Sequence, residues 1–191
     1  MGQKRGCDER CGKVAGQLQT DAMKPNTLES FAEFALADVA ATGRAAALLA
    51  QLTRAGDVIA LWGDLGAGKT TFARGFIGAL SPDEDSVPSP TFTLVQTYPS
   101  SQGDIWHFDL YRLKRADEAY ELGIEEAFAA GISLIEWPER LAGLLPRRRL
   151  DVTLAPGATP ESRRLTLAGD KDWAARLAPL IAALAVDGSP E

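Results

Sequence analysis

The sequence predicts an α/β protein in which a mixed, largely parallel β-sheet is flanked by helices. Short apolar runs with the length of buried strands alternate with segments of helical periodicity. Between one such run and one such helix lies a glycine-rich segment, residues 63–70, and strand, glycine-rich turn and helix together are typical of a phosphate-binding loop. The composition, 46% hydrophobic and 24% charged residues, is that of an ordinary globular domain.

The first half of the chain is expected to form the elements around the glycine-rich segment. Phe31–Leu36 is either a first strand or, because this region is rich in alanine, part of a helix. Asp38 can cap a helix that runs to about Leu52. Asp57–Trp62 is a largely apolar run, as in a buried parallel strand, and a helix follows Thr70. The expected buried faces of these two helices are Ala45, Leu48, Leu49 and Leu52, and Phe72, Phe76 and Leu80.

The second half is expected to complete the sheet. Residues 81–90, with three prolines and three acidic residues, predict a loop. Strands are predicted over Thr91–Tyr98, Asp104–Arg112, Ile132–Trp137, Leu150–Leu154 and Arg164–Leu167, the last two joined by Pro156 and Gly157. Helices are predicted over Asp117–Ala129, with a break at Gly123, and over the amphipathic stretch Asp172–Val186.

The predicted domain organisation is a mobile tail over residues 1–26, one domain over 27–186 and a short tail over 187–191. Both cysteines, Cys7 and Cys11, fall in the first tail and are expected to be free thiols. The sequence shows neither a secretory signal nor an apolar run long enough for a membrane span, so a cytoplasmic location is expected. A net charge of −6 argues against the chain binding nucleic acid on its own, because neutralising phosphates needs a basic surface.

Residues 63–70 form a complete G-x-x-x-x-G-K-[ST] motif, which predicts that the domain binds a nucleoside triphosphate, as in P-loop NTPases. Glycines let successive backbone N–H groups turn toward phosphate oxygens. Lys69 can bridge the β- and γ-phosphates, and the Thr70 hydroxyl can ligate Mg²⁺. The residues expected to bind the nucleotide here are Gly63, Asp64, Leu65, Gly66, Ala67, Gly68, Lys69 and Thr70.

Hydrolysis requires further groups beside the phosphates, and two acidic residues are candidates. Glu136 ends a buried strand, at the sheet edge where open parallel sheets bind ligands. Asp109 lies in a predicted strand on which His107, Asp109 and Tyr111 share a polar face. Either carboxylate could hold Mg²⁺ or orient water, whereas His107 is expected to be a hydrogen-bonded structural residue. Thr91 follows the proline-rich loop, in the place where nucleotide switches carry a threonine that senses the γ-phosphate.

Four segments in this order resemble the bacterial TsaE (YjeE) family, the ATPase of tRNA threonylcarbamoyladenosine biosynthesis. They are residues 63–72, the segment Ser89–Val95 (SPTFTLV), the segment His107–Leu113 (HFDLYRL) and the segment Ile135–Glu139 (IEWPE). The likeness covers about residues 34–185.

The resemblance implies an ATPase that acts with the TsaB and TsaD proteins to modify adenosine 37 of tRNAs that read codons beginning with A. It assigns Lys69, Asp109 and Glu136 to catalysis. Thr70, Asp109 and Glu136 are assigned to Mg²⁺. Contacts to ATP are assigned additionally to Thr71, Thr91, Trp137 and, early in the first helix, Thr42. Contact with tRNA is then indirect, through partners that supply a basic surface.

Two other functions are compatible with a phosphate-binding loop. A small-molecule kinase needs an acceptor pocket and an arginine-rich lid, for which residues 147–149 are the available candidate. A non-enzymatic switch would use bound ATP to control the docking of partner proteins, and ATP turnover would be incidental. A GTPase is disfavoured because no N-K-x-D tetrapeptide occurs.

Overall fold

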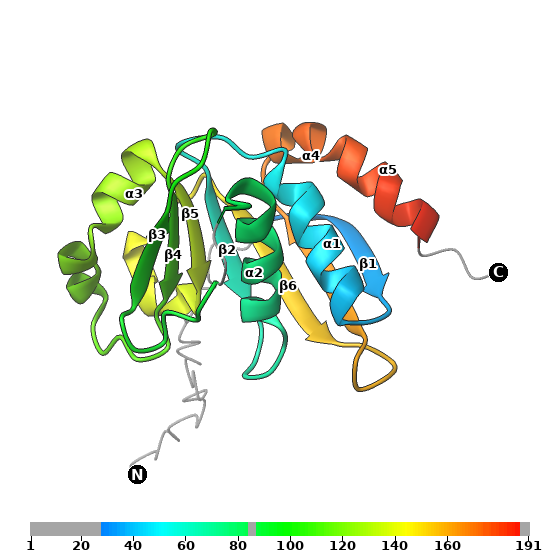
Figure 1. Ribbon diagram of the computed structural model, residues 1–191, viewed down its shortest axis with the longest axis horizontal. Coiled ribbons are helices and arrows are strands. Elements are labelled where there is room, and N and C mark those ends of the chain that lie inside the picture. The colour runs from blue at the N-terminus through cyan, green and yellow to red at the C-terminus, as the bar shows by residue number, and fades with distance from the viewer. Residues whose placement is uncertain (1–27, 84–86, 188–191) are drawn as a thin grey trace, which may run out of the picture.

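The computed structural model describes residues 28–83 and 87–187, which form a seven-stranded sheet with helices on both faces (Figure 1). Cys7, Cys11 and all of the predicted N-terminal tail, residues 1–26, lie outside the described residues. No helix in these two ranges is both long and apolar enough to cross a membrane.

The strand order is β1-β7-β6-β2-β5-β4-β3, and the fold class predicted from the sequence is confirmed. The central strands are parallel, because β2 pairs with β5 and β6, and β4 pairs with β5. The outer strands β1, β7 and β3 pair antiparallel with their neighbours. The strands are β1 (Ser30–Leu36), β2 (Val58–Trp62), β3 (Val95–Tyr98), β4 (Ile105–Asp109), β5 (Ile132–Glu136), β6 (Leu150–Pro156) and β7 (Arg163–Ala168).

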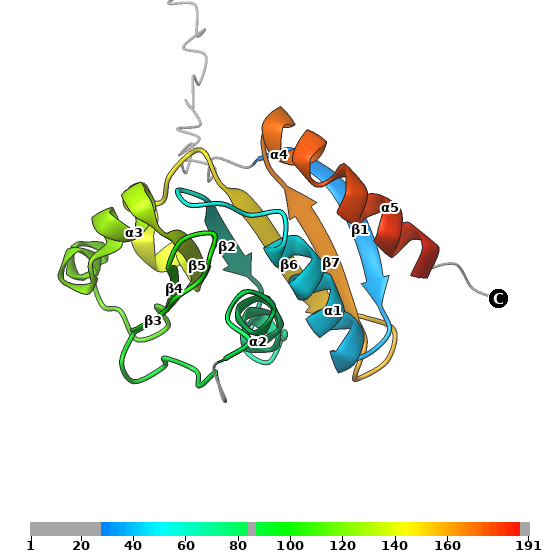
Figure 2. The same cartoon turned by 45° about the horizontal axis from the view of Figure 1, so that its top comes forward.

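Two apolar clusters cover the two faces of the sheet. The larger packs α1 (Val39–Ala50), α2 (Lys69–Leu80), α4 (Lys171–Arg176) and α5 (Ala178–Asp187) on one face, and Figure 2 shows α1 and α2 lying together over it. The smaller packs η1 (Ala116–Leu122), α3 (Ile124–Ala130) and η2 (Pro138–Leu144) on the other. His107, Asp109 and Glu136 belong to the face that carries α2, since Phe108 and Ile135 belong to the second cluster.

Most expected elements are present, and the helix boundaries follow from local chemistry. Asp38 caps α1, its carboxylate accepting a hydrogen bond from the Ala41 N–H at 2.6 Å. Gly123 separates η1 from α3 with a φ of +78°. The expected C-terminal helix is two helices, α4 and α5, divided at Leu177. Pro179 lacks the N–H that a continuous helix would need there.

Three expectations about the remaining segments are corrected. Only Val95–Tyr98 of the predicted strand Thr91–Tyr98 is a strand, because the Leu94 N–H bonds to the Pro90 carbonyl at 2.6 Å and closes a turn. The strand predicted over Asp104–Arg112 ends at Asp109, so Tyr111 lies beyond it. Leu48 is 41% exposed and does not belong to the buried face of α1.

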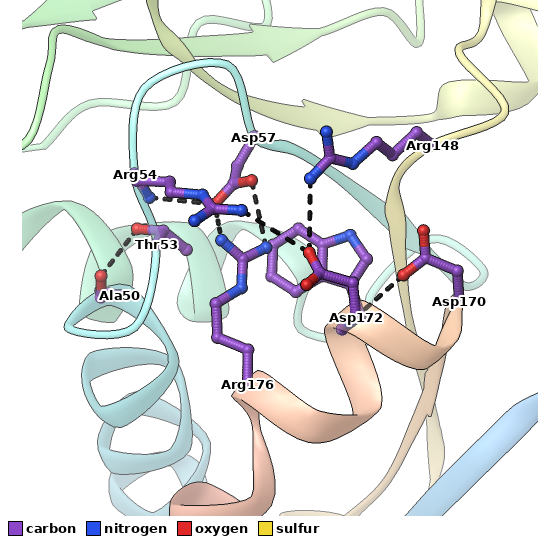
Figure 3. Close-up of polar contacts among 9 residues, drawn as sticks. Ala50, Thr53, Arg54, Asp57, Arg148, Asp170, Asp172 and Arg176 are labelled. Carbon is purple, nitrogen blue, oxygen red and sulfur yellow. Dashed lines mark hydrogen bonds and ion pairs between the residues drawn. The ribbon is translucent and has the colours of Figure 1, made fainter.

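A cluster of charged side chains attaches α4 to the sheet at the edge where β2 begins (Figure 3). Arg176 donates to both carboxylate oxygens of Asp57, at 2.8 and 3.1 Å, and its guanidinium stacks on the Trp173 ring. Asp57 is only 6% exposed, so its charge depends on these bonds. Arg54 and Arg148 reach Asp172 at the exposed rim of the cluster.

Candidate functional site

The glycine-rich segment leaves the end of β2 and turns sharply into α2. Gly63 has a φ of +133°, and a Cβ atom there would collide with the Leu154 carbonyl oxygen on β6. Gly68 caps α2 with a φ of +104°. Both positions therefore require glycine, and the first N–H groups of α2, which have no partner within a helix, are available to a ligand. The segment thus has the backbone conformation that the sequence motif predicts.

Lys69 crosses the loop and is held by backbone oxygens and by an aromatic ring. Its Nζ donates to the Gly63 carbonyl at 2.6 Å and to the Asp64 carbonyl at 3.0 Å. The same Nζ lies 3.7 Å from the centre of the Trp137 ring. Burial lowers the pKa of Lys69 below its usual value, while nearby carboxylates, Glu136 above all, partly oppose this shift.

Trp137 reaches Lys69 because its backbone is in the left-handed region, with a φ of +60°. A bulky residue rarely adopts that conformation, which costs free energy and is concentrated at functional sites. The Tyr111 ring contacts Trp137 at a centroid distance of 4.8 Å. The two aromatic residues therefore form one wall beside the lysine.

Glu136 ends β5 and is hydrogen-bonded through both carboxylate oxygens. The Thr70 hydroxyl donates to Oε2 at 3.0 Å, and His107 Nε2 lies 2.9 Å from Oε1. Glu136 is 2% exposed and His107 is fully buried. The strand-end carboxylate predicted from the sequence thus meets the predicted metal-binding hydroxyl directly.

Asp109 ends the neighbouring strand β4 and is opposite Glu136 in the register. Its Oδ2 accepts a hydrogen bond of 2.6 Å from the Thr91 hydroxyl, and its Oδ1 accepts one from the Tyr111 N–H at 3.2 Å. Ser89 reaches both Thr91 and Asp109. The turn that replaces the first half of the predicted strand therefore brings Thr91 to the candidate site.

Arg163, at the start of β7, binds the outside of the phosphate-binding loop. Its Nε donates to the Ala67 carbonyl at 2.8 Å, and its Nη2 donates to the Gly66 carbonyl at 3.2 Å. Both carbonyls are thereby held by one guanidinium, and the loop conformation is braced by a residue from a distant strand.

These groups surround an open cleft of about 270 Å³. Of the residues expected from the sequence, the cleft is lined by Leu65, Gly66, Gly68, Lys69, Thr70, Thr71, Thr91, Asp109, Glu136 and Trp137. Gly63, Asp64 and Ala67 are not among the lining residues. Their backbone carbonyls accept hydrogen bonds from Lys69 and Arg163 and so stabilise the loop. Thr42 is buried in α1 with its hydroxyl on the Asp38 carbonyl, and it does not line the cleft, so its contact with ATP stays a prediction.

Sequence reasoning did not assign two contributors to this site, Tyr111 and Arg163. His107, expected to be a hydrogen-bonded structural residue, is buried and bonded to Glu136. The alternation of polar residues along β4 already placed His107 on the face of Asp109. No local signal indicates Arg163, because its contact with the loop depends on how the β6–β7 hairpin folds back.

A profile of the family described as "Threonylcarbamoyl adenosine biosynthesis protein TsaE" matches residues 36–165, which is more than half of the chain. The chain belongs to the TsaE family. All residues that line the cleft lie inside the matched range, as does Arg163. Arg176 and the helices α4 and α5 lie beyond it.

Individual TsaE proteins support this assignment. The chain is 48% identical to the tRNA threonylcarbamoyladenosine biosynthesis protein TsaE of Rickettsia conorii over 113 residues, which cover 59% of this chain and 65% of that protein. It is 41% identical to the TsaE protein of Bacillus subtilis over 110 residues, covering 57% and 68%. The match thus spans about two thirds of the length of these relatives.

A solved structure shares the fold. The crystal structure of YdiB from Bacillus subtilis superposes with a TM-score of 0.65 at 27% identity, covering 82% of this chain and 97% of that chain. The predicted P-loop NTPase-like architecture is therefore supported by the strand order, by the TsaE match and by this neighbour.

Proposed function

We propose that this TsaE family member binds and hydrolyses ATP and acts with TsaB and TsaD in the threonylcarbamoylation of adenosine 37 in tRNAs reading codons that begin with A. The observation that carries the proposal is the 3.0 Å hydrogen bond between Thr70 of the phosphate-binding loop and Glu136 at the end of β5. This bond joins the group expected to hold Mg²⁺ to a buried acidic residue at one wall of the cleft.

The residues of the cleft fit Mg·ATP. The loop and the start of α2 offer backbone N–H groups and the positive end of a helix dipole to phosphates. Lys69 supplies the positive charge for the β- and γ-phosphates. In the described part of the chain no three His, Cys, Asp or Glu side chains gather into a metal site of their own. That agrees with a magnesium site that takes one or two protein oxygens and completes its shell with phosphates and water.

The two carboxylates differ in their partners, and this difference suggests separate tasks. Glu136 accepts a hydrogen bond from Thr70, the expected Mg²⁺ ligand, so we assign Glu136 to the magnesium site. Asp109 is held by Thr91 and by the Tyr111 N–H, so we assign it to orienting the attacking water as well as to the metal's water shell. Bound Mg²⁺ would neutralise charge that develops on the phosphates.

Residues 147–149 are poorly placed to serve as the arginine-rich lid that the kinase alternative needs. Arg149 is 6% exposed and binds the Asp151 carboxylate at 2.6 and 3.1 Å. The basic run 147–149 precedes β6 and therefore lies at the sheet edge opposite the cleft, because β6 is parallel to β2.

The site assignment is tested by Lys69→Ala. We expect the steady-state ATPase rate to fall by roughly 10²–10³-fold, since one preorganised charge on the transferred phosphate is removed. Lys171→Ala, at the exposed first residue of α4, is the matched control and should keep the parental rate. Equal rates in the parent and Lys69→Ala would overturn the site assignment.

The pathway assignment is tested by mixing the chain with purified TsaB, TsaD, tRNA and the threonylcarbamoyl donor. We expect an ATP-dependent gain in modified adenosine over repeated cycles, and no gain would reject the role. Glu136→Ala in the same assay separates hydrolysis from docking. If the variant loses ATP hydrolysis and still supports modification, the switch alternative holds.

A further inference from the structure

His107 is a fully buried imidazole whose one polar contact within residues 28–83 and 87–187 is with Glu136. It lies on β4, two residues before Asp109, and its Nε2 is 2.9 Å from Glu136 Oε1. Its Nδ1 has no hydrogen-bond partner among the described residues. A residue kept only for the stability of the core would gain more from apolar packing or from a second hydrogen bond, since buried polar atoms are costly when unpaired.

The contact with His107 fixes the plane of the Glu136 carboxylate. Thr70 holds Oε2 and His107 holds Oε1, from α2 and from β4 respectively. A carboxylate accepts hydrogen bonds only, so the hydrogen of the second bond belongs to Nε2 of the imidazole. With a single hydrogen-bond partner, the carboxylate could rotate about χ3, a torsion with a broad energy minimum. Two partners on different oxygens prevent that rotation.

We propose that His107 is a positioning residue that orients Glu136 toward Thr70 and so prepares the magnesium side of the cleft. The inference rests on the proposed function and adds to it a residue that touches neither nucleotide nor metal. It predicts that His107 affects how strongly Mg²⁺ increases ATP affinity, while ATP binding without Mg²⁺ is untouched. Groups that orient the ligands of a metal typically change metal affinity or activity by 10–100-fold when they are lost.

Two amide substitutions separate positioning from packing. In His107→Gln the amide can take the place of Nε2 and still donate to Glu136, whereas the shorter amide of His107→Asn falls at the Nδ1 position. The affinity of each folded variant for a non-hydrolysable ATP analogue is measured calorimetrically with Mg²⁺ and with EDTA, together with kcat and KM for ATP hydrolysis.

We expect the Mg²⁺-dependent gain in affinity and kcat to fall about tenfold in His107→Asn and to stay within about threefold of the parent in His107→Gln. Affinity in EDTA should be the same in all three proteins. Equal losses in both variants, or none in either, would overturn the proposal even if both melt at lower temperatures. A parent that binds no ATP analogue would instead reject the proposed function, and the inference with it.

A measurement on the parental protein covers the case in which His107→Asn does not fold. His107 is the single histidine of the chain, so the imidazole ¹⁵N signals of tag-free protein need no assignment. The spectrum should show the Nε2 hydrogen that the bond to the Glu136 carboxylate requires. Its Nε2 signal should shift on adding Mg²⁺ with the ATP analogue and not on adding the analogue in EDTA. A signal that ignores Mg²⁺ contradicts the proposal.

Discussion

Arg163 and Ala67 are joined by a 2.8 Å hydrogen bond that spans 96 residues of sequence, from the start of β7 to the phosphate-binding loop. A second bond, 3.2 Å long, reaches Gly66. Two consecutive carbonyls of the loop are thereby held by one guanidinium. Backbone N–H groups bind phosphates in loops of this kind, so under the proposed function the arginine would influence nucleotide binding through the loop conformation.

We expect Arg163→Ala to raise the dissociation constant for ATP about tenfold, which corresponds to roughly 1.4 kcal/mol. Hydrogen bonds to a charged group contribute about that much. Arg164→Ala is the matched control, because the side chain of the neighbouring Arg164 is exposed and its ion pair among the described residues is with Glu33, at 3.6 Å. Calorimetric titration with ATP checks both variants, and equal dissociation constants would contradict a bracing role for Arg163.

The lowered pKa of Lys69 predicts how nucleotide affinity depends on alkaline pH. Phosphates bind the protonated amine, so affinity is constant below the pKa of Lys69 in the free protein and falls as pH rises through it. Because burial lowers that pKa, the decline should begin below the value of 10.5 that an ordinary lysine has. Fluorescence titrations with a nucleotide analogue at increasing pH measure this decline in affinity. Lys69→Met should abolish the decline.

The same shift predicts a small effect on folding. Between the lowered pKa and the ordinary one, the unfolded chain binds more protons at residue 69 than the folded chain does. The free energy of unfolding should therefore rise with pH across that window, by an amount that Lys69→Met removes. Urea titrations of parent and variant at matched pH values give this difference.

Arg176→Met should lower the free energy of unfolding by about 3 kcal/mol, because the buried Asp57 carboxylate loses both of its guanidinium bonds. Arg148→Ala, at the exposed rim of the same cluster in Figure 3, should cost less than about 1 kcal/mol. Adding Asp57→Asn to Arg176→Met should recover part of the loss, since it removes the unpaired charge. Urea unfolding measures all three, and a larger loss in Arg148→Ala would refute the ranking.

Two glycines of α2 should respond to alanine in opposite directions. A Cβ atom at Gly75 would lie 2.7 Å from the Gly43 carbonyl oxygen and 2.8 Å from its Cα, both backbone atoms of α1. Gly75→Ala should therefore destabilise by about 1–3 kcal/mol through overpacking. At Gly78 nothing lies within 4 Å, so Gly78→Ala should stabilise by about 0.5–1 kcal/mol. Urea midpoints with equal slopes would check the signs, and a Gly75→Ala variant as stable as the parent would disprove the close approach of the helices.

The sequence predicted the parts of the site that local rules control. The spacing of glycines, Lys69 and Thr70 predicts a loop and a helix start, and an apolar run that ends in Glu136 predicts a carboxylate at the ligand edge of a parallel sheet. Both expectations rest on backbone geometry that a few neighbouring residues determine, and the structure brings Thr70 and Glu136 within hydrogen-bond distance.

Features that depend on distant contacts were not predictable in the same way. The β-branched and aromatic residues of 91–98 favour a strand, but the bond from Thr91 to Asp109 and the turn closed at Leu94 outweigh that propensity. Periodicity likewise predicted an amphipathic helix over residues 172–186, and its apolar residues Trp173, Leu177, Leu180 and Leu184 are buried. It missed the division at Leu177, because the pattern of apolar residues continues across it.

The strand order has a consequence for how the chain is made. Both sheet neighbours of β2, which are β5 and β6, come later in the sequence, and the nearer of them begins only at Ile132. At about 5–20 residues per second of translation, an apolar strand with two unpaired edges waits several seconds for its first partner. A nascent chain halted in that interval would expose β2 and the unfinished loop together, which makes this period the one in which binding by a chaperone matters most.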